Sequence, residues 1–145
     1  MSATLYTPEI LRLSVETAAI PRLPAPHASA ERRAPVCGSR VIVDVAMDGG
    51  SVSAIGLEVR ACAMGQASSA LFAKGAVGRT SAELAATATA LRNWLTGASD
   101  TPPDWPGIAA LAPARAYPAR HGAILIPFEA AAVAAAEAQQ VQAVA

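Results

Sequence analysis

The chain has 145 residues with 11 basic and 11 acidic side chains, so we expect one domain over residues 1–145 and no positive field to attract nucleic acid. Although 53% of the residues are hydrophobic, charged side chains interrupt every apolar stretch before the roughly 20 residues of a bilayer span, and a signal peptide would not contain Pro8, Glu9 and Arg12. We therefore expect a cytoplasmic protein with neither nucleic acid nor membrane as a partner.

The N-terminal part of the chain predicts a short helix followed by a loop. Thr7 supplies a capping hydroxyl, Pro8 a preset backbone angle and Glu9 a negative charge, and these signals are typical of a helix start. Four prolines then lie within residues 20–36, and proline at this density interrupts both helix and sheet hydrogen bonding. We expect residues 20–36 to form an extended, partly mobile loop.

The next segment has the pattern of a β-hairpin. From Arg40 the residues alternate, with valines on one face and Asp44 on the other, which is predicted to face solvent. Gly49 and Gly50 can adopt the positive φ angles of a tight turn, and the alternation then resumes up to Arg60. We expect two antiparallel strands.

The rest of the chain predicts helices separated by a second loop. Residues 62–74 have helical spacing of apolar side chains, and a capping box begins another helix that ends at Gly97. Residues 98–107 form a second proline-rich loop, and the final helix becomes alanine-rich. Because alanine offers little side-chain mass to pack, we expect residues 137–145 to be frayed.

Two cysteines are the main chemical candidates. Cys37 precedes the first strand of the hairpin and Cys62 follows the second, so the hairpin brings both thiols to the same end of the sheet. Thiolates are soft ligands that favour zinc, copper(I) or iron-sulfur clusters, and His121 is a candidate third ligand. The alternative is that both cysteines are small buried hydrophobic residues and that the histidine is a solvated surface group.

The residues around both cysteines resemble a known family. The segments PVCGSRV at 35–41 and GLEVRACAMGQASSAL at 56–71 are similar to the central part of the IscU, SufU and N-terminal NifU scaffolds, and the RHGA turn at 120–123 agrees with them. This resemblance covers most of the chain, from the first helix to about residue 130. It implies an α+β fold, with a small antiparallel β-sheet of two or three strands packed against about four to five helices. It also implies a non-enzymatic scaffold or carrier for a [2Fe-2S] cluster or iron, with a cysteine desulfurase and recipient apo-proteins as partners.

The family assembles its cluster on three cysteines, an aspartate two residues after the first cysteine and, in some branches, a histidine beside the third. Carried over by position, Cys37 and Cys62 match the first two cysteines and His121 the histidine, whereas Ser39 replaces the aspartate and Gly122 the third cysteine. We expect Cys37, Cys62 and His121 to hold the cluster, completed by water, a small thiol or a second subunit, in a monomer or homodimer. The alternatives are a zinc site on the same side chains, a divergent paralogue that acts as a protein-interaction module, and sulfur transfer through a persulfide on Cys62.

Overall fold

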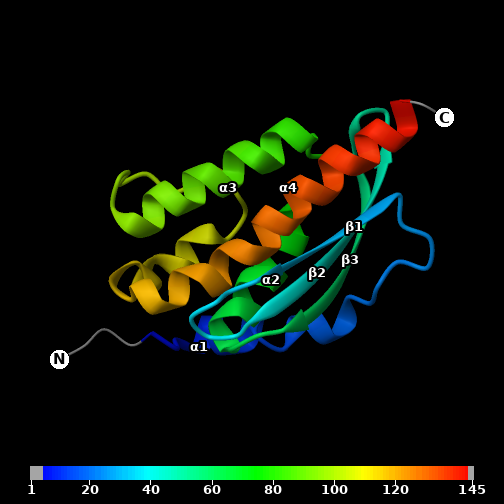
Figure 1. Cartoon of the computed structure of the whole chain (residues 1–145). Coiled ribbons are helices and arrows are strands. Elements are labelled where there is room, and N and C mark those ends of the chain that lie inside the picture. Colours follow the sequence, from blue (N-terminus) through cyan, green and yellow to red (C-terminus); the bar gives the residue numbers. More distant parts are fainter. Residues whose placement is uncertain (1–4, 144–145) are drawn as a thin grey trace.

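The computed structural model describes residues 5–143, which contain four α-helices, three short 3-10 helices and one three-stranded sheet (Figure 1). The elements in chain order are α1 (Pro8–Leu13), η1 (Glu16–Ala19), β1 (Ala28–Arg33), β2 (Arg40–Asp48), β3 (Ser51–Arg60), α2 (Ala63–Gly75), α3 (Ser81–Thr96), η2 (Ile108–Ala116), η3 (Pro118–Arg120) and α4 (His121–Ala143). The predicted α+β class with a small antiparallel sheet is confirmed.

The sheet has the order β1-β2-β3, and both strand pairs are antiparallel. The β2–β3 hairpin is the predicted one, and its turn contains Gly49 and Gly50 with φ angles of 60° and 86°. The prediction that residues 20–36 form a loop throughout is wrong, because strand β1 occupies residues 28–33 of that segment. The prolines of that segment end at Pro26 and resume at Pro35, so the residues between them keep the amide donors that pair with β2.

One face of the sheet packs against α4, and α3 lies along the other side of that helix (Figure 1). The alanines of α4 allow this close approach, since six of them are fully buried: Ala123, Ala130, Ala131, Ala134, Ala135 and Ala138. The predicted fraying does not hold for residues 137–143, which are helical. Gln142 donates its side-chain amide to the backbone oxygen of Met47 at 2.7 Å. Residues 144–145 lie outside the described part.

The segment Pro118–Gln142 is long and apolar enough to cross a membrane by length and composition, but 61% of its most apolar window is buried inside the protein. The segment is apolar because it packs in the hydrophobic core. Phe128 packs edge-on against Phe72 and Trp105 at centroid distances of 5.5 and 5.1 Å, within the main hydrophobic core. The indole of Trp105 also donates to the backbone oxygen of Leu71 at 2.8 Å, which fixes the end of the proline-rich segment 98–107 to α2.

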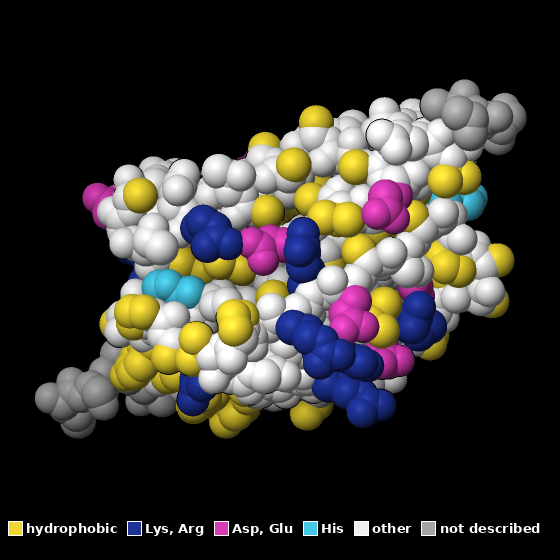
Figure 2. All heavy atoms as spheres, in the orientation of Figure 1, with side chains coloured by type: hydrophobic (Ala, Val, Ile, Leu, Met, Phe, Trp, Pro, Cys, Tyr) yellow, Lys and Arg dark blue, Asp and Glu magenta, His cyan; other side chains and the backbone are white. Residues whose placement is uncertain are grey.

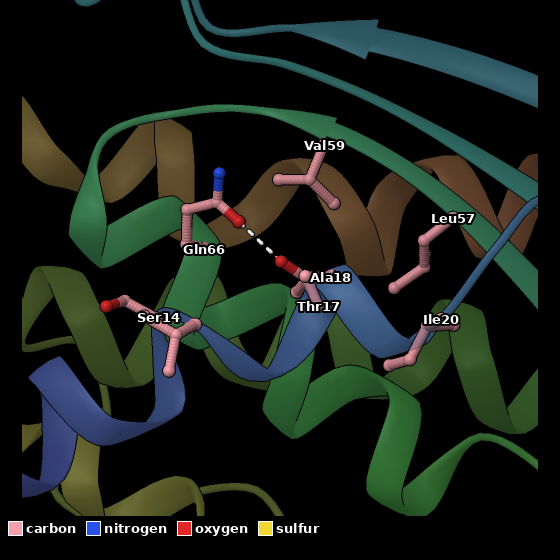
Figure 3. Close-up of a pocket in the computed structure, with 8 residues that line it drawn as sticks. Ser14, Thr17, Ala18, Ile20, Leu57, Val59 and Gln66 are labelled. Carbon is pink, nitrogen blue, oxygen red and sulfur yellow. Dashed lines mark hydrogen bonds between the residues drawn. The ribbon is translucent and has the colours of Figure 1, made fainter.

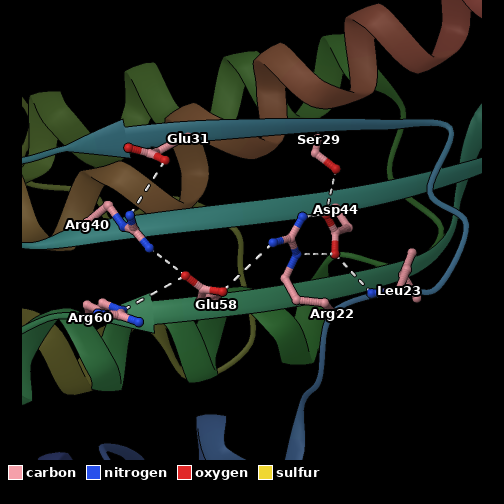
Figure 4. A network of polar contacts seen from close by, with 8 residues as sticks. All are labelled: Arg22, Leu23, Ser29, Glu31, Arg40, Asp44, Glu58 and Arg60. Atoms are coloured by element: carbon pink, nitrogen blue, oxygen red, sulfur yellow. Dashed lines mark hydrogen bonds and ion pairs between the residues drawn. The ribbon is translucent and has the colours of Figure 1, made fainter.

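The outer face of the sheet carries a network of charged side chains (Figure 4). At its centre Asp44 is fully buried, although its position in the alternating pattern predicts a solvent-facing side chain. It accepts hydrogen bonds from Arg22, from the amide of Leu23 and from the hydroxyl of Ser29. The segment before β1 therefore crosses over β2 and β3 and covers the carboxylate. In Figure 2 the largest group of basic side chains lies at the lower right of centre with acidic side chains at its edge, and a smaller group above it alternates in sign.

Candidate functional site

Cys37 lies in the turn between β1 and β2, and that turn is closed by backbone hydrogen bonds. The amide of Ala34 donates to the oxygen of Ser39 at 2.8 Å, and the amide of Gly38 donates back to the oxygen of Ala34 at 2.9 Å. Gly38 has a φ angle of 71°, a left-handed conformation that glycine adopts without strain. The turn thus holds the half-buried Cys37 at the end of the sheet.

Cys62 occupies the N-cap position of α2, directly after β3. Its backbone is extended, and its carbonyl oxygen accepts the first helical hydrogen bond from Gln66 at 2.9 Å. The side chain makes no capping hydrogen bond and is half-buried. The residue therefore lies at the positive end of the α2 helix dipole.

A third side chain, Ser39, connects the two cysteine residues. Its hydroxyl oxygen accepts a hydrogen bond from the Cys37 thiol at 3.0 Å and lies 3.4 Å from the amide nitrogen of Cys62. Only 2% of Ser39 is exposed. The structure therefore brings the two predicted cysteines to one end of the sheet, as expected from the hairpin, and neither forms a disulfide.

Several groups act on the protonation of Cys37. Burial acts to raise the pKa of its thiol, while the hydroxyl and backbone of Ser39 and the positive charge of Arg120 act to lower it. The lowering effects together outweigh the effect of burial, so the pKa of Cys37 lies below that of an ordinary cysteine. Because the thiolate is the form that binds metal, this environment suits a ligand.

His121 and Gly122 are the first two residues of α4, and only His121 has a side chain that could bind a metal. The imidazole of His121 is 9% exposed, and its Nε2 lies 2.9 Å from the backbone oxygen of Ala114. A carbonyl oxygen can only accept, so Nε2 is the donor in this contact, and Nδ1 is the ring nitrogen that it leaves unused. At Gly122 a β-carbon would lie 3.3 Å from that of Ala34, so this position faces the turn that carries Cys37.

The three predicted ligands do not form a preassembled metal site. Among the residues at 5–143, no three or more His, Cys, Asp or Glu side chains are grouped closely enough to hold a metal ion. The structure brings Cys37 and Cys62 together through Ser39. One ring nitrogen of His121 is instead in hydrogen-bond contact with a backbone carbonyl. Sequence reasoning treats Ser39 only as a lost ligand and does not identify it as the link between the cysteines.

A pocket of about 470 Å³ lies between η1, the end of β3 and the first turns of α2 (Figure 3). Its walls combine the apolar side chains of Leu57 and Val59 with Thr17, whose hydroxyl donates to the side-chain oxygen of Gln66. Gln66 is one helical turn beyond Cys62. The pocket therefore borders the cysteine end of the molecule, and no sequence motif predicts it.

Comparison with known proteins places this geometry in a family. Neither a protein-family model nor a curated protein sequence matches the chain. Among solved structures, the N-terminal part of a nitrogen-fixing NifU-like protein from Brucella abortus has 33% sequence identity and a TM-score of 0.86, over 94% of this chain and 95% of that one. An iron-sulfur cluster assembly scaffold protein for the SUF system from Fervidobacterium islandicum AW-1 has 22% identity and a TM-score of 0.80, over 90% of this chain and 96% of that one, and shows the fold alone. Because the Brucella protein is similar over nearly its whole length, the chain belongs to the U-type iron-sulfur cluster scaffold family, together with the NifU-like N-terminal domains.

Proposed function

We propose that this protein is a scaffold that holds iron or a [2Fe-2S] cluster on Cys37 and Cys62, with His121 as the third ligand. The observation that supports this most is the pair of half-buried cysteines at one end of the sheet, where the buried hydroxyl of Ser39 contacts the thiol of Cys37 and the backbone amide of Cys62. The cluster is cargo, which the protein receives and passes on. The solved NifU-like and SUF-system scaffold structures, which share the fold, support the same role.

The chemistry of the side chains fits iron but leaves the coordination incomplete. Thiolates are the usual ligands of a [2Fe-2S] cluster, which takes four protein ligands, and the whole sequence contains two cysteines. The lone pair on Nδ1 of His121 provides a third donor, as imidazole does in clusters of mixed ligation. A small thiol, water or the cysteine of a second copy completes the site, in a monomer or a homodimer.

The role proposed is that of a carrier without catalytic activity, acting in the cytoplasm, where thiols stay reduced. A cysteine desulfurase supplies the sulfur, and recipient apo-proteins take the finished cluster. Sulfur transfer through Cys62 is the enzymatic variant of this role. Mass spectrometry after incubation with a desulfurase and cysteine tests it, because an unchanged mass for the peptide of Cys62 rejects a persulfide there.

Anaerobic reconstitution with ferrous iron and sulfide, followed by native mass spectrometry, tests the scaffold role. We expect added mass corresponding to two irons and two sulfides, on one chain or on two. His121→Ala should reduce the yield if the imidazole is a ligand and leave it unchanged if the external ligands suffice. A folded wild-type protein that gains no iron mass would contradict the proposal.

A second candidate is a divergent paralogue that binds zinc or a protein partner without assembling clusters. The contact between the imidazole of His121 and the backbone oxygen of Ala114 favours the protein-interaction form, because it engages one of the two ring nitrogens that could bind metal. A titration with cobalt(II), a coloured substitute for zinc, distinguishes the two candidates. Tetrahedral cobalt bands that zinc displaces, together with failure to assemble a cluster, would favour the zinc site.

A further inference from the structure

The buried hydroxyl of Ser39 lies between Cys37 and Cys62. It is 2% exposed, 3.0 Å from the sulfur of Cys37 and 3.4 Å from the amide nitrogen of Cys62. We propose that Ser39 is a positioning residue: its hydroxyl donates a hydrogen bond to the Cys37 sulfur when that sulfur binds iron, and this bond prolongs retention of the cargo. The inference rests on the proposed scaffold function.

The proposed role follows from what a hydroxyl can donate and accept. A serine hydroxyl has one proton to donate and two lone pairs, and here the oxygen accepts from the thiol of Cys37 and the amide of Cys62. When iron binds, the thiol of Cys37 releases its proton to solvent and its sulfur becomes an acceptor. The hydroxyl of Ser39 can then turn its own proton to that sulfur, while the Cys62 amide still donates to the oxygen. No heavy atom has to move.

The surroundings hold this hydroxyl in place. The backbone oxygen of Ser39 accepts from Ala34 within the closed turn, and the amide of Cys62 is fixed because that residue caps α2. A hydrogen bond to a ligating sulfur withdraws negative charge from it and is one of the features by which proteins tune iron-sulfur clusters. Loss of such an outer contact typically weakens metal binding about 10- to 100-fold.

Ser39→Ala is the direct test, with cluster retention measured as the half-life of the visible absorption during challenge with an iron chelator. We expect the half-life to fall by about tenfold or more. Ser69→Ala is the matched control, because Ser69 lies in α2, is fully buried and has a hydroxyl with no hydrogen-bond partner among residues 5–143. It should retain the cluster like the wild type, and Ser39→Thr, which keeps the hydroxyl, should restore most of the retention.

Two further measurements separate positioning from mere structural support. In the metal-free protein, Ser39→Ala should speed hydrogen exchange of the Cys62 amide, which loses its acceptor. In the loaded wild type, transfer into D₂O should shift the Fe–S stretching bands in resonance Raman spectra. This measurement tests the hydrogen bond to the Cys37 sulfur even if the alanine variant does not fold. Equal half-lives for folded Ser39→Ala and wild type, or no deuterium shift, would overturn the inference alone, whereas a wild type that binds no iron would overturn the scaffold function with it.

Discussion

Replacing Asp44 with asparagine should destabilise the fold by about 3 kcal/mol. The carboxylate is fully buried and accepts two hydrogen bonds from Arg22, at 2.7 and 2.9 Å, and others from Leu23 and Ser29. Asparagine keeps the shape but turns a donating amide toward these donors and removes the charge. Breaking a buried ion pair costs about 3–5 kcal/mol, and we expect the lower end because the side chain of Arg22 is 42% exposed and can return to water.

The same contacts predict how stability depends on pH. Burial acts to raise the pKa of Asp44, but the hydrogen bonds from Arg22, Ser29 and Leu23 outweigh it and hold the pKa below the ordinary value. A carboxylate with a lowered pKa in the folded state contributes its full stabilisation above the unfolded value of about 4 and loses it as the pH falls through the folded value. The free energy of unfolding of the wild type should therefore fall below about pH 4.

Urea denaturation followed by far-UV circular dichroism measures both effects, at pH 7 and in steps down to pH 3. Asp44→Asn should lower the midpoint at pH 7 and flatten the acid slope. Asp48→Asn is the control, since that aspartate ends the same strand and is exposed, and it should change the stability by less than about 0.5 kcal/mol. An Asp44→Asn protein as stable as the wild type at pH 7, with the full acid slope retained, would refute the reasoning.

Three further changes test particular contacts. Gly56→Ala would place a β-carbon 2.5 Å from the amide nitrogen of Leu23, so it should cost about 1–3 kcal/mol in urea denaturation, and an unchanged midpoint would contradict the crossing of that segment over the sheet. Thr80→Ala removes the hydroxyl that caps α3 and should cost about 1 kcal/mol in the same assay, while no loss would show that the cap contributes nothing. Gly122→Cys would put a thiol beside the turn at Ala34 and should lengthen iron retention under chelator challenge; retention equal to that of the wild type would show that the position does not reach the cargo.

The hairpin and the helix starts could be predicted from the sequence because their signals are local. Gly49 and Gly50 mark a turn that requires positive φ, and Thr80 with Glu83 forms the complete capping box. The convergence of Cys37 and Cys62 follows from the same hairpin. The turn and the cap depend on residues a few positions apart, and the hairpin that the turn closes then brings the more distant Cys37 and Cys62 to one end of the sheet.

The features that could not be predicted depend on partners far away in the chain. Strand β1 forms because β2 offers an edge to pair with, and the flanking prolines conceal this in the sequence. Asp44 has the alternation of a solvent-facing residue, and it is buried only because the segment at Arg22 crosses over it. The alanine-rich sequence predicts fraying over 137–145, yet the small size of the buried alanines up to Ala138 is what lets α4 approach the sheet.

In the candidate site too, the residue types could be predicted from the sequence but their contacts could not. The sequence identifies Cys37, Cys62 and His121, but it contains no sign that the imidazole is committed to the backbone oxygen of Ala114. Nor does it show that Ser39 touches both cysteines, because that contact joins a turn to a helix start 23 residues away. Residue types can nominate ligands, whereas their mutual placement comes from tertiary structure.

The central claim is that Cys37 and Cys62 together hold an iron-sulfur cargo, and absorption after anaerobic reconstitution tests it most directly. Wild type, Cys37→Ala and Cys62→Ala would be loaded with iron and sulfide under the same conditions, after circular dichroism has shown all three to be folded. We predict a visible charge-transfer band in the wild type that is lost in each variant, because neither thiolate alone retains the cluster. A band of full intensity in both variants, or none in the wild type, would contradict the account.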